Sequence, residues 1–388
     1  MTTVQRVIGL DAHPAVFTAA ALTPGNNASQ AVINQVTDSL ALDRLERWAT
    51  THTTTRDLFV LEASGNSFDI VARLKAIDRA ALVLESARVG QIEKTYCTTD
   101  KHSAVKIARV YLSGLAISVW VPDDITRGRR DILNAYLRAD QDSVRARNRL
   151  KGFLSGHGKR LPKGTRLTQP SGLKTLLGLA AWTPLQHELL RMMQEDLART
   201  DSQRKRLRTT MAMEVTRDPN LLKLMRLFGV RHIVAFALAA YIGDIRRFAS
   251  PKQLVAYIGL NPRVRFSGQN GYTGALAHSG QRKLRSLLAE AAHTILRCQQ
   301  SPLHAWGWKI YLRKNRNCAA IAIARKLAVA CWYLMHNLFT PLQELDSTIK
   351  LKIHKVVTCI GKQNVLKIGF KTCLEYEKHI QQTMLLSA

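Results

Sequence analysis

The sequence lacks several features that would assign it to familiar protein classes. Six cysteines occur in 388 residues, and none forms a CxxC pair, so neither a zinc ribbon nor a CxxC redox site is indicated. The first residues lack the charged-then-apolar layout of a secretory signal. No apolar run approaches the roughly 18 uncharged residues of a membrane span. We therefore expect a reducing cytoplasmic setting, with the cysteines as buried small hydrophobic residues.

Acidic residues are also scarce. Asp and Glu total 28 against 57 Lys and Arg, which gives a formal net charge of +29. So large an excess is typical of proteins that bind nucleic acid. An anionic membrane surface is the alternative, but neither a lipidation signal nor an amphipathic anchor stands out, so we expect no membrane partner. The length favours two or three domains.

Residues 1–125 are predicted to form an α/β domain. Three successive strands are expected at 4–10, 16–22 and 30–36. Helices and strands then alternate, with a helix through Leu40, Leu42, Leu45 and Trp48, a strand at 57–62, a helix at 67–77, a strand at 81–85, a helix near 103–113 and a strand at 117–121. This order predicts a mixed sheet covered by helices. It is the element order of ribonuclease H-like (RuvC-like) folds, in which the first strand, the fourth strand and a late helix bring acids to one sheet edge.

The rest of the chain is predicted to be all-α. Two long helices over 126–216 suggest a helical hairpin, either a solvated spacer or a coiled coil used for dimerisation. Residues 217–340 form a mainly helical domain with a helix over 221–242 that breaks at 228–230, a short helix at 251–258, a loop at 261–271 and a further helix from Ser279. Residues 341–388 are a basic extension, either a helical tail or an RNA-contacting appendage.

Three acids stand at the ends of predicted elements. Asp11 and Glu62 each end an apolar run with strand length, and Asp100 stands just ahead of a helical pattern. An Asp at the end of one strand usually starts a turn. Three carboxylates from separate elements instead suit a divalent-metal site for phosphoryl transfer, in which the ions clamp the attacking and leaving oxygens.

The loop at 261–271 contains a candidate nucleophile, Ser267. A serine hydroxyl is a poor nucleophile unless a base or a strong local field activates it. Arginines in a glycine-rich loop beside helix N-termini are suited to binding a phosphodiester. The expected nucleic-acid contacts are Arg263, Arg265, Arg282, Lys283 and Arg285. A Ser-Gly pair in a loop by itself usually forms only a turn, but among these arginines Ser267 is a candidate for the group that attacks DNA phosphorus.

Two blocks of motifs occur in a characteristic order. They are Gly9-Leu10-Asp11, Leu61-Glu62-Ala63-Ser64-Gly65, Thr99-Asp100 with Ala104 and Ile107-Ala108, then Ile242-Gly243-Asp244-Ile245, Phe248, Gln253-Leu254-Val255-Ala256-Tyr257-Ile258-Gly259-Leu260-Asn261-Pro262, Ser267-Gly268, and Gly280 with Leu284-Arg285. On these residues the chain resembles the Piv/MooV-type insertion-sequence transposases, DEDD recombinases with a RuvC-like domain and a transposase domain that bears a catalytic serine. The resemblance covers residues from about 5 to 297.

The resemblance implies a set of metal ligands. The family's four acids fall on Asp11, Glu62, Asp100 and position 103, which is Ser103 here. The implied cofactor is Mg²⁺, with Mn²⁺ as a substitute. Because a neutral hydroxyl is a weak ligand for Mg²⁺, either Ser103 holds a metal-bound water, or the site binds one ion less firmly, or this copy is impaired. A second departure is Phe228-Gly229-Val230-Arg231, where the family often has a Pro-Gly-Ile-Gly type turn.

The resemblance also implies an activity and partners. The protein would recombine donor and target DNA of its own mobile element, with Ser267 forming a transient phosphoserine link while Asp11, Glu62 and Asp100 hold Mg²⁺ near the same phosphate. The family works as dimers that pair into tetramers, with active sites shared between subunits. A structured non-coding bridge RNA pairs with donor and target DNA. Specificity by base pairing agrees with the absence of any visible helix-turn-helix or zinc-finger motif.

Two other functions remain open on the residues alone. A RuvC-like nuclease that cleaves branched DNA with metal-activated water needs only Asp11, Glu62 and Asp100, and leaves Ser267 dispensable. A decayed copy would bind nucleic acid without catalysis, and Ser103 is the best support for it. The second motif block, over 242–285, favours the recombinase.

Overall fold

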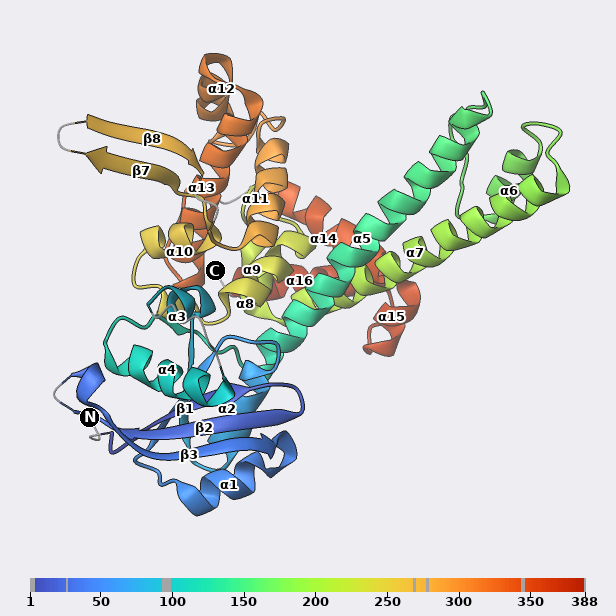
Figure 1. The fold of residues 1–388 in the computed structure, drawn as a ribbon. Helices are drawn as coiled ribbons and strands as arrows, with labels where there is room; N and C mark the ends of the chain where they lie inside the picture. The colour runs from blue at the N-terminus through green and yellow to red at the C-terminus, as the bar shows by residue number, and fades with distance from the viewer. Residues whose placement is uncertain are drawn as a thin grey trace. The chain divides into compact units, whose positions relative to one another are not determined.

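The computed structural model describes residues 4–25, 27–92, 99–267, 270–276, 279–342 and 346–386. The chain divides into two compact units, Met1–Pro122 and Asp123–Ala388. The first is a mixed sheet with helices and the second is mostly helical (Figure 1). The predicted fold class, a mixed α/β sheet followed by a mainly helical region, is therefore confirmed. We describe each unit by itself.

Unit 1 is built on a six-stranded sheet with the order β3-β2-β1-β4-β5-β6. Strands β1, β4 and β5 are parallel to one another, whereas β2, β3 and β6 pair antiparallel with their neighbours. The strands are β1 (Val7–Ala12), β2 (Val16–Thr23), β3 (Val32–Ala41), β4 (Leu58–Glu62), β5 (Ala80–Leu84) and β6 (Ser118–Val119). The three hairpin-connected strands thus precede the parallel crossovers, as the sequence predicts.

Helices cover both faces of this sheet, and the strand residues alternate between the two cores. Ile8 and Leu10 belong to the apolar cluster that includes side chains of α1 (Leu45–His52) and α2 (Ser67–Ala76). Val7 belongs to the opposite cluster, formed with α4 (Asp100–Leu112) and Val89 of α3 (Ser86–Ile92). Because successive strand residues face opposite sides, this alternation also decides which way each strand's last residue points.

Several predictions for unit 1 need correction. The strand expected at 30–36 lies at 32–41, so Leu40 belongs to β3 and the helix expected to include it begins at Leu45. Thr37 and Ser39 carry the strand past the point where leucines suggested helical spacing, because pairing with β2 continues to Ala41. Helix α3 was not predicted. Helix α4 begins at Asp100 and not near 103, since Thr99 caps it by accepting from the amide of His102.

Unit 2 begins with two long helices that pack against each other, α5 (Asp124–Gly156) and α7 (Pro184–Arg217), seen as the green hairpin in Figure 1. At 1.5 Å per residue each is about 50 Å long. Their shared core contains Leu150, Leu154 and Leu190, and Arg149 pairs with Asp196 across it. The short helix α6 (Pro170–Leu177), which was not predicted, lies in the connection between them. The long helices therefore bury one face within a single chain.

The remainder of unit 2 is a helical core with one hairpin. The helices are α8 (Pro219–Leu224), α9 (His232–Ile242), α10 (Pro251–Ile258), α11 (Arg282–Ile295), α12 (His304–Arg313) and α13 (Arg316–Met335). The loop expected at 261–271 is wrong, because β7 (Pro262–Ser267) pairs antiparallel with β8 (Asn270–Leu276). Among the described residues one helix, α13, is long and apolar enough to cross a membrane, but half of its apolar stretch is buried inside the protein, as in a core helix.

The basic C-terminal residues continue the same core. Helices α14 (Asp346–Ile360), α15 (Lys362–Lys367) and α16 (Cys373–Leu386) add apolar side chains such as Ile353 and Ile380 to the cluster that contains α8, α9 and α13. Lys352 is buried, and its Nζ donates to the carbonyl oxygens of Met225 at 2.8 Å and Leu227 at 2.7 Å. The segment that the sequence sets apart as an extension is thus packed into the helical unit.

Candidate metal centre and serine hairpin

Asp11 and Glu62 end two neighbouring parallel strands. Strand β1 is in register with β4 up to the pair Leu10 and Leu61, so Asp11 and Glu62 follow one step beyond. Leu10 and Leu61 both face the core that contains α1 and α2. The next residue on each strand points the other way, toward the face covered by α4. Both carboxylates are half-buried and lie on the α4 face of the sheet.

Helix α4 supplies the third acid because it packs directly on β1. Gly9 makes this approach possible, since a Cβ at that position would lie 1.9 Å from the carbonyl oxygen of Ala104 and 3.0 Å from the Cβ of Ala108. The N-terminus of α4 is held by an ion pair of 3.0 Å between Lys101 Nζ and Asp38 Oδ2 of β3. Asp100 is the first residue of this helix, where the helix dipole favours a negative charge.

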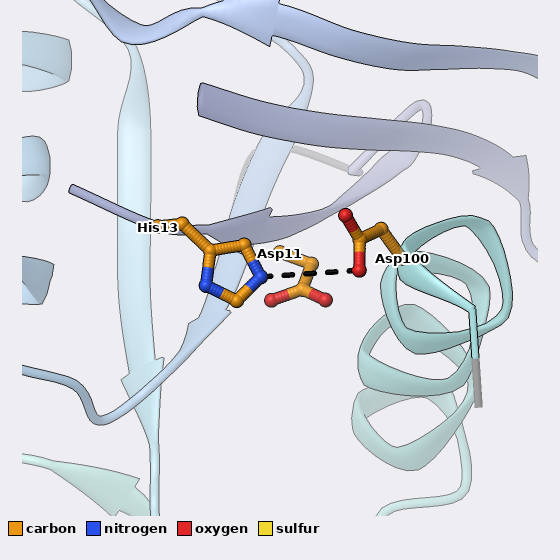
Figure 2. Close-up of side chains that lie close together, drawn as sticks. All are labelled: Asp11, His13 and Asp100. Carbon is orange, nitrogen blue, oxygen red and sulfur yellow. Dashed lines mark ion pairs between the residues drawn. The ribbon is translucent and has the colours of Figure 1, made fainter. Parts of the chain in front are cut away.

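Three side chains converge at this point: Asp11, His13 and Asp100 (Figure 2). Their candidate ligand atoms all lie within 4.8 Å of one another. His13 Nε2 lies 3.9 Å from Asp100 Oδ1. The backbone of His13 is fixed, because its amide donates to the carbonyl of Val16 at 2.8 Å and its carbonyl accepts from Asn66 Nδ2 at 3.1 Å. The end of β1 and the start of α4 therefore define a compact cluster.

The electrostatics of the cluster favour a cation. The pKa of Asp11 is raised, chiefly because burial removes water from its carboxylate. His13 acts in the opposite direction, the like charge of Asp100 raises the pKa further, and a hydrogen bond from Ser103 lowers it. A divalent ion would compensate both carboxylates, so this donor set of carboxylate oxygens and an imidazole fits a metal ion.

The four residues predicted to bind the metal differ in how close they lie to one another. The carboxylate oxygens of Asp11 and Asp100 lie within 4.8 Å of each other, and Ser103 lies one turn into α4, where its hydrogen bond lowers the pKa of Asp11. Glu62 stands at the end of the adjacent strand but is not part of the three-residue cluster. His13 was not predicted to act here. The spacing Asp11-x-His13 could have indicated it, because alternate residues of an extended strand face the same side.

The predicted nucleophile lies at the end of a strand. Ser267 is the last residue of β7, and its backbone pairs with Asn270 of β8. The structure describes the backbone of Arg265 and Ser267, while their side chains lie outside the described part. Residues 268 and 269 lie outside it as well, so the predicted role of Ser267 stays a prediction.

The base of this hairpin is closed by two glycines. Gly259 ends α10 with φ 80°, and Gly280 precedes α11 with φ 96°. A Cβ on Gly259 would lie 2.3 Å from the carbonyl oxygen of Ser279, and one on Gly280 would lie 2.6 Å from the amide nitrogen of Gly259. Arg285 Nη1 donates to the carbonyls of Gly259 and Ser279 at 3.0 and 3.3 Å. These contacts fix the chain on both sides of the hairpin.

The predicted basic contacts therefore divide into two kinds. Arg285 is half-buried and holds the hairpin base, which is a structural contact. Arg263, Arg282 and Lys283 are exposed, and Lys283 Nζ donates to Asn134 Oδ1 of α5 at 2.7 Å. The exposed cations at the start of β7 and α11 can meet a phosphate backbone without desolvation of a buried charge.

Comparisons with known proteins give a consistent result. Residues 222–306 match the family model described as "Transposase IS116/IS110/IS902 family". The chain is 26% identical over 289 residues to a probable family 20 transposase of Pseudomonas aeruginosa, which covers 72% of this chain and 83% of that protein. It is 24% identical over 306 residues to a putative transposase of Sinorhizobium fredii, with 71% and 74% covered. A transposase for the insertion element IS1111A of Coxiella burnetii is 25% identical over 192 residues, with 48% and 53% covered.

Proposed function

We propose that this chain, which the matches support as a transposase of the IS116/IS110 family, cleaves and rejoins DNA through a serine–phosphate intermediate at a metal-assisted site. The convergence of Asp11 and Asp100 on the α4 face of the sheet is the single observation that carries the metal-dependent part. The sheet order, with acids at the ends of the first and fourth strands and at the start of a later helix, supports a RuvC-like assignment for unit 1.

Asp11, Glu62 and Asp100 would hold Mg²⁺ or Mn²⁺, with Ser103 orienting the Asp11 carboxylate through its hydrogen bond. When bound, a divalent ion offsets the negative charge that develops on a phosphodiester during displacement. The chain's own contribution is to hold two carboxylates on rigid elements, because strand ends and a capped helix keep them at fixed separations.

The serine step exchanges one P–O bond for another. Ser267 Oγ attacks the scissile phosphorus, the Oγ–P bond forms, the bond to one deoxyribose oxygen breaks, and the hydroxyl proton ends on that leaving oxygen. Arg263 and Arg282 are exposed at the start of β7 and α11, where they can pair with the flanking phosphates. The reverse attack by another deoxyribose hydroxyl rejoins DNA and regenerates Ser267. Because the serine–phosphate bond replaces the broken DNA phosphodiester, the bond energy is kept in the intermediate and DNA can be rejoined without another energy source.

A structured guide RNA, an oligomer and a cytoplasmic, nucleoid-associated location complete the proposal. The net charge of +29 supports an assembly with more than one nucleic acid strand. The long α5–α7 pair already buries its shared face within one chain, so oligomerisation would have to use other surfaces. A homodimer or tetramer would allow the metal centre and the serine hairpin of different subunits to act on one phosphate.

The test is recombination in cells between donor and target plasmids, with the flanking DNA of the element supplied as the RNA source. Junctions are sequenced for the parent, Ser267→Ala, Asp11→Ala and the control Ser250→Ala. Ser250 precedes α10, and its side chain makes no capping bond. The expected result is accurate junctions for the parent and Ser250→Ala, and none for the other two. A protein–DNA adduct that resists denaturation and depends on Ser267 would identify the intermediate.

A RuvC-like nuclease is the second candidate, and one observation favours it. The acidic cluster lies wholly within unit 1, which has its own sheet and cores and does not contain Ser267. If Ser267→Ala still cleaves DNA while Asp11→Ala does not, the serine step is wrong and water is the nucleophile. If the parent and both variants alike neither recombine nor cleave DNA, both candidates fail and nucleic-acid binding is the remaining function.

A further inference from the structure

The histidine in the cluster lies beside Asp100 at the distance of a loose ion pair. His13 Nε2 and Asp100 Oδ1 are 3.9 Å apart, which is longer than the roughly 2.7–3.2 Å of a hydrogen bond and leaves both atoms able to bind a common ion. Two ligands at about 2.1 Å from one ion lie about 3.0 Å apart when adjacent and about 4.2 Å apart when opposite. The separations among Asp11, His13 and Asp100, all within 4.8 Å, are close to that range.

The position of His13 is set by backbone contacts on both sides. Its amide donates to Val16 in the turn from β1 to β2, and its carbonyl accepts from Asn66, which follows β4. The imidazole is therefore delivered from the same strand end as Asp11, and Figure 2 shows it directed toward Asp100 with Asp11 alongside. A ligand held by a fixed backbone needs little reorganisation to bind an ion.

The neighbouring residue on α4 does not supply an additional anionic ligand. Ser103 lies one turn after Asp100, and its hydroxyl bonds to Asp11. Within the cluster the donors are thus two carboxylates and one imidazole. Mg²⁺ prefers oxygen ligands and gives up its waters reluctantly. Mn²⁺ shares the preference for carboxylate oxygens, but as a first-row transition ion it accepts an imidazole nitrogen more readily than Mg²⁺ does.

We propose that His13 is a metal ligand through Nε2, and that it makes this site bind Mn²⁺ in preference to Mg²⁺. The inference rests on the proposed metal-assisted function, and it adds a specificity-determining residue to that site. Asp11 and Asp100 supply the charge that any divalent ion requires, and His13 decides which ion is held more firmly. Replacing His13 by an oxygen donor should therefore shift the preference toward Mg²⁺.

The experiment measures metal binding by the full-length protein without DNA. Free Mn²⁺ is counted by electron paramagnetic resonance to obtain its Kd, and Mg²⁺ is added as a competitor. The parent is compared with His13→Ala, Asp11→Asn and the matched control His102→Ala. His102 lies two residues beyond Asp100 but is exposed and outside the cluster. Circular dichroism melting curves establish that each variant is folded.

We expect His13→Ala to weaken Mn²⁺ binding by at least about tenfold, since loss of even an outer-shell partner of a metal ligand costs about 10–100-fold. Mg²⁺ binding should change much less, and His102→Ala should behave as the parent. Pulsed paramagnetic resonance should show a ¹⁴N coupling to bound Mn²⁺ in the parent that disappears in His13→Ala. His13→Asp, which keeps a donor in place, should bind without the ¹⁴N coupling and should favour Mg²⁺ more than the parent does.

The outcomes separate this inference from the function on which it rests. If Asp11→Asn abolishes Mn²⁺ binding while His13→Ala leaves both the Kd and the ¹⁴N coupling unchanged, His13 is not a ligand but the metal centre stands. If Asp11→Asn also binds Mn²⁺ like the parent, the metal centre itself is wrong. If His13→Ala does not fold, the ¹⁴N coupling of the parent and the metal preference of His13→Asp decide the question.

Discussion

Replacing Gly9 by alanine tests whether the candidate metal site depends on the close contact between α4 and β1. The added Cβ would lie 1.9 Å from the carbonyl oxygen of Ala104 and 3.0 Å from the Cβ of Ala108. The first of these is a backbone atom within a helix, so it cannot turn aside as a flexible side chain would. Either α4 moves away from the sheet, or β1 bends at position 9, just before Leu10 and Asp11.

The size of the effect follows from these distances. Raising the contact with Ala104 from 1.9 Å even to 3.0 Å requires a displacement of about 1.1 Å. Overpacking of a well-packed core costs about 1–3 kcal/mol, and a rigid backbone contact belongs near the upper end. Asp100 is the first residue of α4 and moves with it, so the cluster with Asp11 is distorted as well. A misplacement of about 1 Å in a reacting site can reduce rates by about 100-fold.

The assay combines urea denaturation with hydrogen exchange of α4 amides and Mn²⁺ binding. Gly9→Ala should lower the free energy of unfolding, increase exchange in α4 and weaken Mn²⁺ binding. The control is Gly65→Ala, which lies near Glu62 and whose added Cβ meets nothing within 4 Å. It should match the parent in all three measurements. If Gly9→Ala matches the parent too, α4 does not rest on β1 as described, and the account of how Asp100 is positioned is wrong.

Three further predictions concern the charge at the site and the packing of unit 2. Asp11→Asn should raise the free energy of unfolding of the metal-free protein at pH 7 by less than about 1 kcal/mol, since the side chain is half-exposed and its raised pKa means that folding favours the protonated form. In urea denaturation this gain over the parent should vanish below the ordinary pKa of 3.8, where Asp11 is protonated in both states, and an equal gain at pH 3 would contradict the reasoning. Lys352→Met should lower the free energy of unfolding of the helical unit by about 2–4 kcal/mol in urea denaturation, since two buried carbonyl oxygens lose a charged donor. Unchanged stability would mean that the residues beyond 346 pack differently. Gly259→Ala should abolish recombination in the plasmid assay while Mn²⁺ binding persists. Gly259 has φ 80°, and an added Cβ would lie 2.3 Å from the carbonyl oxygen of Ser279, so the base of the hairpin would have to open. Recombination at the parental rate would mean that the hairpin has no part in the mechanism.

The sheet and its acids could be predicted because their signals are local. An apolar run that ends in Asp11 or Glu62 indicates both the strand and the point where it leaves the core. When two such strands pair in parallel, their C-terminal ends lie side by side, so the two acids are brought to the same edge of the sheet. The start of α4 is predicted three residues late, because Asp100 and Lys101 carry no apolar periodicity and the Thr99 cap that starts the helix was not predicted.

The features that were missed depend on contacts between distant segments. The hairpin at 262–276 contains Pro262 and several glycines, which locally favour a loop, and its strands form because Gly259 and Gly280 meet and Arg285 joins both backbones. The C-terminal helices carry many lysines and therefore resemble a solvated tail. Their buried residues, such as Ile353 and Lys352, are recognisable only once α8 and its carbonyls are in place.

The candidate metal cluster of Asp11, His13 and Asp100 costs folding free energy, and the surrounding residues explain how the fold tolerates it. Asp11 and Asp100 are like charges in a partly desolvated place, and the raised pKa of Asp11 reports that strain. The helix N-terminus and its Thr99 cap stabilise Asp100, and the Lys101–Asp38 pair fixes that end of the helix to β3. Removing Asp11 should therefore make unit 1 more stable and less able to bind an ion. A gain in stability together with a loss of ion binding distinguishes a binding site from a structural ion network. In such a network, removing any one charged group would destabilise the fold.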